Sequence, residues 1–450
     1  MPPFAIIAGY VALATLDLCW ALFLTLLNYR HVAARAGTVP GPLAESVSAE
    51  EAAKAASYSL AKMRFSFVQA PIVTAITVAA AALGLFGLLD RAESALVAGA
   101  YWRGALFLGS VALAQGLLSI PFELYSTFSL EKRFGFNTTS PRTWLLDLAK
   151  SAGLAIVLGL PLLYLLYVFI DGTGGLWWLW AATAYALINL LISLIYPLVI
   201  APLFNKFSPL SEGSLAAKIG ELARRLDFKV GGVFVMDSSK RSRHSNAYFT
   251  GLGRVKRVVL YDTLVSGAPE EEILAILAHE IGHEKRKHVQ KATVASIAFS
   301  FLIFWVMSLM MKWQSLYAAF GFAQASKHAI LLILSLVAGP ATFFIAPAFS
   351  AWSRSREYQA DKFAVEALAS GASAADKFAV EALASGAIAA DAAQAVRGRA
   401  LASALLRLNR ENASNLWPHR LYSAWYYSHP ALVERLAAIA EADGLSSQKA

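Results

Sequence analysis

Long apolar runs recur along this chain and restrict its possible folds more than any other feature. Each run is close to the roughly 20 residues that an α-helix needs to cross a bilayer. Hydrophobic residues make up 57% of the 450 residues and charged residues only 15%, whereas about 25% is usual for charged residues in soluble proteins. The sequence therefore predicts a mostly α-helical, polytopic membrane protein. Seven spans are expected, at residues 4–27, 65–89, 105–124, 154–170, 177–200, 293–311 and 330–351.

Lysine and arginine are unevenly distributed between the loops that separate these runs. Most lie after the first, third and fifth runs and in the C-terminal tail. Because cytoplasmic loops carry the excess of positive charge, we expect the N-terminus outside, and both polar segments and the C-terminus in the cytoplasm. This bias accounts for the net charge of +9 without a nucleic-acid partner.

Two polar segments alternate with the apolar runs. The first contains an amphipathic helical pattern at 211–226 and three short strand patterns, and then a helix that opens near Pro269 and is expected to continue through His288. We predict four parts: 1–203 with five spans, 204–291 as the catalytic segment with a small sheet, 292–351 with two spans, and 352–450 as a helical C-terminal segment.

The helix expected after Pro269 contains the sequence His279-Glu280-Ile281-Gly282-His283. Histidines four residues apart lie on one helical face, where both can bind one Zn²⁺ ion. Glu280 would then lie beside a water on that metal and could take its proton. A polar patch on a surface helix is the alternative that these five residues leave open.

A catalytic zinc site usually has three protein ligands, so a third is expected elsewhere. Glu357 and Asp361 lie four residues apart in the C-terminal segment and so share a helical face. Glu357 is the candidate third ligand, and Asp361 could accept the free ring N–H of a ligand histidine. The alternative is a pair of surface acids balanced by Arg354 and Arg356.

Together these motifs resemble those of the type I CAAX prenyl endopeptidases, which are integral-membrane zinc proteases. The resemblance covers nearly the whole chain, and its further motifs lie at 131–137, 200–207, 242–251, 427–430 and 434–436. It implies seven spans around a water-filled chamber and a zincin-type metalloprotease domain with a small β-sheet that faces it. It also implies one Zn²⁺ per chain held by His279, His283 and Glu357, with Glu280 as the general base.

The resemblance further implies how a peptide substrate is held. Residues Asn246, Ala247, Tyr248 and Phe249 would form an edge strand that pairs with extended substrate, with Asn246 holding its backbone.

Three more residues are placed around the site by the same resemblance. Arg435 would lie near the metal and hold Glu357 or the substrate, and His429 would contact the substrate. His288, like Asp361, would lie in the shell around the ligands, and it has no assigned role.

The chain departs from the family pattern at Tyr426, where a histidine is usual. That histidine is a plausible partner for the oxyanion of the tetrahedral intermediate, and a tyrosine hydroxyl can also donate a hydrogen bond. Tyr426 is therefore our oxyanion candidate. Loss of one such donor typically lowers the rate about 10²- to 10³-fold.

A second departure is a tandem repeat, because residues 360–372 recur identically at 375–387. The second copy has Ala372 where the first has Glu357, so it offers no second ligand. Two units are too few to stack as a repeat array, and we interpret the insertion as an extension of a peripheral helix or loop.

These observations predict a membrane zinc metalloendopeptidase that hydrolyses peptide bonds near the C-terminus of prenylated CAAX-type peptides. The alanine-rich composition favours a bacterial protein of the inner membrane; a eukaryotic one would lie in the endoplasmic reticulum. A bacterium has few prenylated proteins, so a quality-control protease without prenyl specificity is the first alternative, and a non-catalytic scaffold or transporter the second. The expected partners are a peptide or protein substrate, possibly lipidated, and the lipid bilayer, while the oligomeric state stays open.

Overall fold

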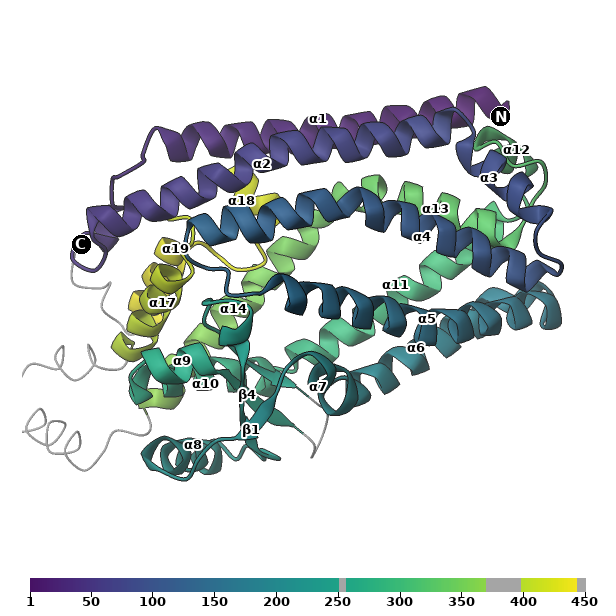
Figure 1. Cartoon of the computed structure of the whole chain (residues 1–450). Helices are drawn as coiled ribbons and strands as arrows, with labels where there is room; N and C mark the ends of the chain where they lie inside the picture. The colour runs from purple at the N-terminus through teal and green to yellow at the C-terminus, as the bar shows by residue number, and fades with distance from the viewer. Residues whose placement is uncertain (251–255, 370–397, 443–450) are drawn as a thin grey trace, which may run out of the picture.

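The computed structural model describes residues 1–250, 256–369 and 398–442, and in these the protein is mostly α-helical (Figure 1). Six of the described helices are long and apolar enough to cross a membrane. They are α1 (Pro3–Ala33), α2 (Ala49–Ala82), α4 (Ala100–Tyr125) continued to Glu131, α5 (Pro141–Gly172), α6 (Trp177–Ile195) continued to Phe204 by η4 (Tyr196–Ile200) and α7 (Ala201–Phe204), and α11 (His288–Met310).

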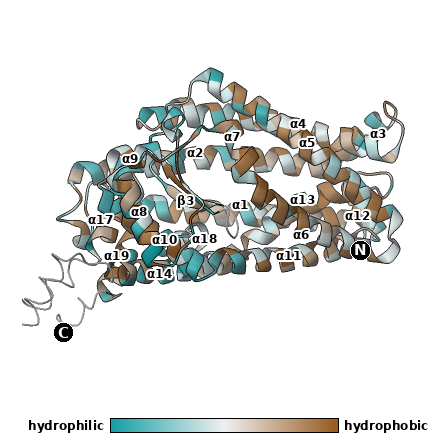
Figure 2. Cartoon of the chain, turned by 90° about the horizontal axis from the view of Figure 1, so that it is seen from below, coloured by the Kyte–Doolittle hydropathy of each residue, from teal (hydrophilic) through white to brown (hydrophobic). Residues whose placement is uncertain are grey.

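The outer faces of these helices are apolar, as contact with lipid requires. Ile156 and Val157 in the middle of α5 are 60% and 67% exposed, which would be unfavourable in water. Figure 2 shows hydrophobic residues along the spanning helices and hydrophilic ones at the end of the molecule that contains α8, α10 and α17. The predicted multi-span architecture is therefore confirmed.

The seventh expected span, 330–351, is not one straight helix. Helix α13 (Lys327–Phe343) ends, and α14 (Ala346–Ala369) begins after a bend of 61°. Pro347 lies in the first turn of α14, where its ring would clash with the carbonyl of Phe343 if the helix were continuous. The pair counts as a span only as a broken one, so the structure has six spans or seven.

Two other expected helix limits are wrong. The second run was expected to extend to residue 89, but α2 ends at Ala82, and α3 (Leu85–Ser94) starts after Gly84, which has φ +66°. The helix after Pro269 was expected to continue through His288. Instead α10 (Glu270–Lys285) ends, Lys287 adopts φ +57°, and α11 starts at His288. Three consecutive cations, at 285–287, are costly to take into a bilayer, so the chain changes direction there.

A four-stranded mixed sheet lies beside α10. Its order is β1-β2-β4-β3, from β1 (Phe207–Pro209), β2 (Val233–Met236), β3 (Ala247–Thr250) and β4 (Arg257–Tyr261). β2 pairs with β4 in parallel, and the other two pairings are antiparallel. The small sheet is confirmed, with β1 as a strand that the sequence did not reveal. Within the described ranges, β3 occupies one edge.

The main hydrophobic core lies between this sheet and the helices around α10. The apolar residues Ile273, Ile276, Leu277 and Ile281 of α10 are all buried in it. The surrounding elements are α8 (Ser214–Arg225), α14, α17 (Arg399–Glu411) and α19 (Leu432–Ala442), with the short helices α9 (Asp262–Gly267) and α18 (Arg420–Tyr426) nearby. This core fixes α10 on several sides, so the side chains on its remaining face are held rigidly.

The predicted borders at residues 203, 291 and 351 fall inside helices α7, α11 and α14. Continuous helices therefore join the apolar and polar parts of the chain, and the division into four parts stays a prediction. The first copy of the duplicated stretch begins in α14, and the second copy, 375–387, lies outside the described residues.

Candidate metal centre

The two histidines of α10 and a glutamate of α14 converge on one point. The Nε2 atoms of His279 and His283 lie 3.1 Å apart. His279 Nε2 lies 3.4 Å from Glu357 Oε2, and His283 Nε2 lies 3.4 Å from Glu357 Oε1. One donor atom from each of the three residues lies within 4.8 Å of the other two. The two predicted motifs thus meet, although α11 and α13 lie between them in the chain.

Gly282 explains how α14 comes so close to α10. A Cβ atom at this position would lie 3.1 Å from the carbonyl oxygen of Ala360 and 3.2 Å from its Cα. The absence of a side chain at 282, and the small one at 360, let the two backbones approach each other. The sequence analysis noted Gly282 only as part of the motif and missed this role; its place one residue before His283 was the available signal.

The donor set fits a divalent metal ion. Glu357 is 4% exposed, and its Oε2 atom is buried without a hydrogen-bond partner among the described residues. An unpartnered buried carboxylate oxygen is costly. Two imidazole nitrogens face the same carboxylate, and a cation between the three groups would satisfy all of them.

Asp361 and Arg435 hold the first ligand in place. Asp361 Oδ1 lies 2.8 Å from His279 Nδ1, so the other ring nitrogen of His279 is the one directed to the metal site. Arg435 donates from Nε to Asp361 Oδ2 at 2.8 Å and from Nη2 to Oδ1 at 2.5 Å. Arg435 was expected to hold Glu357 or substrate, but its shortest contacts are to Asp361, and Glu357 Oε2 is 3.8 Å away.

The protonation of His279 follows from these neighbours. Burial acts to lower the pKa of His279, but the carboxylates of Asp361 and Glu357 outweigh it and raise this pKa to about 9. The metal-free imidazole is therefore protonated at neutral pH. A metal ion must displace that proton, so its affinity should rise with pH.

His288 supports the second ligand in a similar way. Its Nδ1 atom lies 3.1 Å from His283 Nδ1, and its Nε2 atom lies 3.3 Å from Gln359 Oε1. Because His288 is the first residue of α11, the break at Lys287 is what turns this ring back towards His283. His288 therefore lies behind a candidate ligand, and Gln359 is a partner that the sequence analysis did not identify.

Glu280 is the free acid of the site. It makes no hydrogen bond or ion pair with any other residue that the structure describes, although it follows His279 directly in the chain. Burial raises the pKa of its carboxyl group, while the two adjacent imidazoles act against this. A partly desolvated carboxylate without a fixed partner is suited to accept a proton from water.

His429, not Tyr426, contacts the ligand set. His429 Nε2 lies 3.5 Å from Glu357 Oε1, and its side chain is 62% exposed to the adjoining cavity. Tyr426 instead packs against Tyr422 and Phe343, at ring distances of 4.6 and 6.2 Å. Among the described contacts none joins Tyr426 to a ligand, so His429 is the better placed donor.

The residues expected to pair with substrate have mixed positions. Ala247 and Phe249 face the main core, whereas Tyr248 lies on the other face of the sheet with Tyr196 and Phe207. Asn246 is not in β3; its backbone carbonyl accepts from Tyr261 N at 3.1 Å, and its side chain accepts from Ala247 N at 2.8 Å. If a peptide binds here, it therefore has the backbone edge of β3 to pair with, rather than these side chains.

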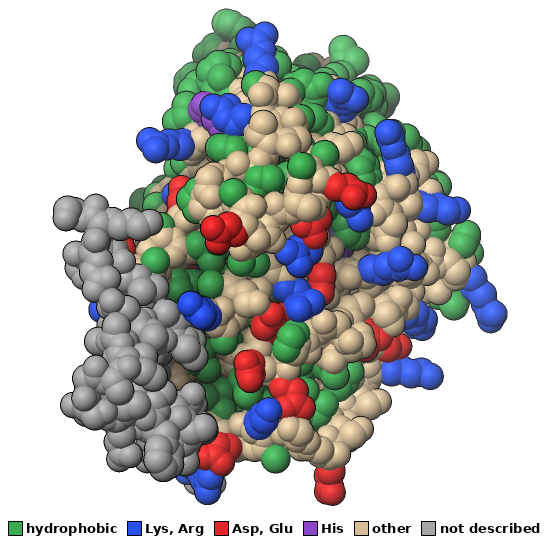
Figure 3. Space-filling model, turned by 90° about the vertical axis from the view of Figure 1, so that its left-hand side faces the viewer, with side chains coloured by type: hydrophobic (Ala, Val, Ile, Leu, Met, Phe, Trp, Pro, Cys, Tyr) green, Lys and Arg blue, Asp and Glu red, His purple; other side chains and the backbone are tan. Residues whose placement is uncertain are grey.

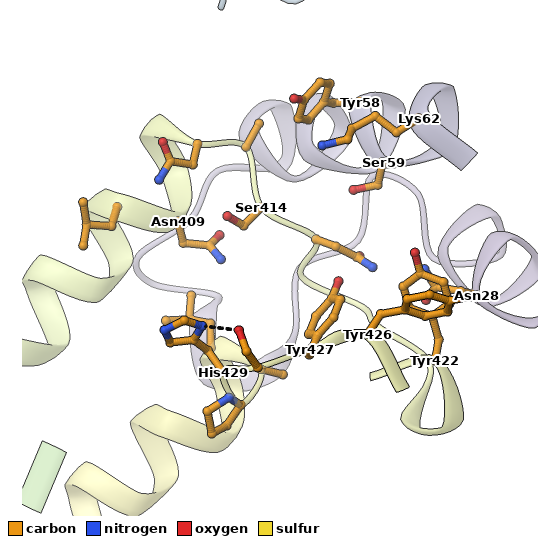
Figure 4. Close-up of a pocket in the computed structure, with 18 of the residues that line it drawn as sticks. Asn28, Tyr58, Ser59, Lys62, Asn409, Ser414, Tyr422, Tyr426, Tyr427 and His429 are labelled. Atoms are coloured by element: carbon orange, nitrogen blue, oxygen red, sulfur yellow. Dashed lines mark hydrogen bonds between the residues drawn. The ribbon is translucent and has the colours of Figure 1, made fainter. Parts of the chain in front are cut away.

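Two cavities flank the metal site. The first cavity, of about 770 Å³, is lined by His429 and Arg435 on one side and by α2 on the other, as Figure 4 shows in part. The second cavity, of about 500 Å³, is lined by His283, His288 and Glu357 and by residues of α6 and α11. A polypeptide that crosses the site would therefore extend into both.

The model of peptidase family M48 matches residues 209–443, and that of the CAAX prenyl protease N-terminal region with five membrane helices matches residues 28–206. The chain belongs to peptidase family M48. It is therefore a multi-pass membrane metalloendopeptidase, and the predicted family and class of enzyme are confirmed. This excludes the alternative of a non-catalytic scaffold or transporter.

Curated relatives of this M48 peptidase match it over most of their length. It is 33% identical over 431 residues to a rice CAAX prenyl protease 1 homolog, which covers 94% of this chain and 95% of that protein. It is 34% identical over 351 residues to the Saccharomyces cerevisiae CAAX prenyl protease 1, with 74% and 71% covered. For the human homolog the identity is 31% over 376 residues, with 75% and 73% covered.

The fold of this M48 peptidase matches a solved structure. The crystal structure of S. mikatae Ste24p superposes with a TM-score of 0.84 at 31% identity and covers 98% of this chain and 99% of that one. The relatives named here are eukaryotic, and the expected bacterial source stays a prediction.

Proposed function

We propose that this M48 peptidase is a zinc endopeptidase that cleaves prenylated CAAX-type peptides near their C-terminus. The main observation behind this proposal is that two imidazole nitrogens converge on a buried carboxylate oxygen that has no hydrogen bond among the described residues, beside the free carboxylate of Glu280. The names of the curated relatives support the substrate class. A quality-control protease without prenyl specificity remains the second candidate.

His279, His283 and Glu357 would hold the metal, and a two-histidine, one-glutamate set is typical of catalytic zinc. When bound, zinc supplies a Lewis acid that polarises the scissile carbonyl and acidifies a water. Asp361 keeps the His279 ring in the orientation needed for this, because its carboxylate accepts a hydrogen bond from the Nδ1–H group of His279.

Glu280 would act as the general base and then as the general acid. It takes a proton from the attacking water and returns it to the leaving amine. His429, at the mouth of the first cavity, would donate a hydrogen bond to the carbonyl oxygen as negative charge develops there. The backbone of residues 246–249 would pair with the extended substrate.

An apolar groove near the metal site is consistent with a substrate that carries a lipid. It has a volume of about 1150 Å³ and lies between α4, α5 and α6, with Glu123 as the only charged residue of its described lining. Tyr185 lines both this groove and the second cavity, so the two are adjacent. An isoprenoid chain near the scissile bond could pass from the metal site through the second cavity into the groove.

The orientation in the membrane is also part of the proposal. We place the N-terminus outside and the metal site in the cytoplasm, because the end of the molecule with α8, α17 and α19 carries most of the charged side chains. Figure 3 shows this end, with Lys, Arg, Asp and Glu side chains spread over it. The cytoplasm is also where lysine and arginine concentrate in multi-span proteins.

Substitution of Glu280 tests the function. Glu280→Gln should keep one zinc per chain and lower cleavage of a farnesylated CAAX peptide by about 10²- to 10⁴-fold, because the base is removed while the ligands remain. The measurements are zinc content and cleavage rate of the purified full chain. Glu271→Gln, at an exposed position in the first turn of the same helix, is the matched control.

Activity that survives in Glu280→Gln would refute the assignment of the base. Chelation should abolish cleavage by the parent protein, and added zinc should restore it. An unprenylated twin peptide cleaved at the same rate as the farnesylated one would favour the quality-control candidate.

A further inference from the structure

The first cavity has a distinctive charge pattern. Its described lining contains neither aspartate nor glutamate, but it contains four basic or ionisable nitrogen side chains, Lys62, His244, His429 and Arg435. Ser59, Lys62 and Ser66 of α2 recur at helical spacing and line this cavity, so α2 presents a polar stripe to it. Such a wall is suited to an anionic ligand.

Three of these side chains are already engaged. Arg435 is held by Asp361, and His429 faces Glu357 at 3.5 Å. His244 Nδ1 lies 2.9 Å from Asn412 Oδ1, and its Nε2 lies 3.7 Å from Glu131 Oε2. These groups therefore have limited capacity to bind a further anion.

Lys62 is the exception. Its amine forms no hydrogen bond or ion pair with any residue in the described ranges and lies only over the Tyr58 ring, 4.9 Å from the ring centre. The carboxylate of Glu131 lies close enough to interact with the charge of Lys62 without forming an ion pair with it, and this carboxylate already accepts from Tyr58 Oη at 2.6 Å. Figure 4 shows the Lys62 side chain on the α2 side of the cavity, across from His429.

We propose that Lys62 binds the C-terminal α-carboxylate of the substrate and so sets where this enzyme cuts. The inference rests on the proposed function. In a C-a-a-X peptide the lipid is on the cysteine, and the free carboxylate ends the three residues that follow. The metal site lies between a cavity that leads to an apolar groove and a cavity with a free cation, and this matches the two ends of such a substrate.

The volume of the first cavity agrees with this arrangement. Three extended residues span roughly 10 Å, which is the length that must fit between the scissile bond and the carboxylate. A cavity of about 770 Å³ lies within the range of sites that enclose drug-sized ligands, and a tripeptide is of that size. A cation at a fixed distance from the metal would select a chain end over an internal sequence.

The test compares two farnesylated CAAX peptides that differ only in a free C-terminal acid or a C-terminal amide. The parent enzyme should have about 10- to 100-fold higher kcat/KM for the acid, since a charge-assisted hydrogen bond is lost in the amide. Lys62→Met should remove this preference by lowering kcat/KM for the acid, mainly through KM, and should leave the amide unchanged. Lys62→Arg should keep most of the preference.

Lys54→Met is the matched control, because Lys54 lies on α2 over the Phe136 ring, at 5.4 Å, outside the lining of the first cavity. This substitution should leave kcat/KM unchanged for both peptides. Inhibition of the parent enzyme by an unprenylated tripeptide gives a readout that needs no variant: the acid should inhibit more strongly than its amide.

Equal kcat/KM for acid and amide in the parent enzyme would overturn this inference and leave the proposed function standing. An equal loss on both peptides in Lys62→Met would also overturn it, since that indicates a structural role. If the zinc-loaded parent cleaved neither peptide, the proposed function would fail.

Discussion

At the residue scale, the metal site depends on one buried chain of charges. Arg435 holds Asp361, Asp361 holds His279, and His279 faces Glu357, with none of the four more than 9% exposed. Buried ionised groups are tolerated only when each is paired. The sequence analysis named all four residues, but the resemblance assigned Arg435 to Glu357 or substrate, whereas the shortest contacts of its guanidinium group are to Asp361.

Substitution of Asp361 should therefore weaken the metal site without removing a ligand. Asp361→Asn cannot balance the charge of Arg435 and is a weaker acceptor for the His279 Nδ1–H, which orients the ring and makes it a stronger ligand, so we expect zinc affinity to fall about 10- to 100-fold. Competition with a fluorescent zinc chelator measures it. Glu366→Gln, at an exposed position further along α14, should change nothing; an unaltered zinc affinity in Asp361→Asn would contradict the role assigned to Asp361.

At the element scale, helix breaks decide where the functional side chains point. Hydropathy located the apolar runs, but it did not show that α10 and α11 are separate helices or that α13 and α14 meet at 61°. The apolar run 330–351 is continuous across the second break, and the signals that end the helices are single residues. Pro347 was a readable signal; Lys287 was not, because lysine has no preference for a left-handed conformation.

A glycine substitution at Lys287 should affect the stability of the protein in the opposite way from a glycine substitution within the adjacent helix. Its backbone has φ +57°, a conformation that costs roughly 1–2 kcal/mol in a residue other than glycine. Lys287→Gly should therefore leave the stability unchanged or raise it by up to about 1 kcal/mol.

Lys291→Gly, within α11, is the paired control and should lower stability by about 1 kcal/mol. Thermal unfolding of both variants in the same detergent measures the difference. Equal destabilisation by the two substitutions would show that the turn at 287 does not need a left-handed residue.

At the scale of the whole molecule, two hydrophobic cores lie at opposite ends. One surrounds α10; the other joins α1, α4, α12 (Gln314–Ala319) and α13 at the end where the N-terminus lies (Figure 1). At that second end a Cβ atom on Gly87 would lie 1.8 Å from the carbonyl oxygen of Gly321. The backbones of α3 and of the chain after α12 are thus in contact, and this contact holds the elements at the end of the molecule opposite the metal site together.

Gly87→Ala should lower the thermal stability by about 1–3 kcal/mol, because the backbone of Gly321 must move to accept a methyl group. Zinc content should stay at one per chain, since the metal site is at the other end. Gly109→Ala, on α4 with no atom within 4 Å of the added carbon, is the control and should not destabilise the protein. A variant at 87 as stable as its parent would show that this contact is not tight.

The sequence by itself determined the membrane architecture and the family, and it named the candidate metal ligands on both helices, because each of these is carried by local hydropathy or by short motifs at fixed spacing. Only the tertiary structure decided that Gly282 lets α14 approach α10, that Arg435 pairs with Asp361, that His429 rather than Tyr426 contacts Glu357, and that two unlike cavities flank the metal site. These depend on distances between atoms from helices far apart in the chain, and such distances follow from how the helices pack rather than from any single segment.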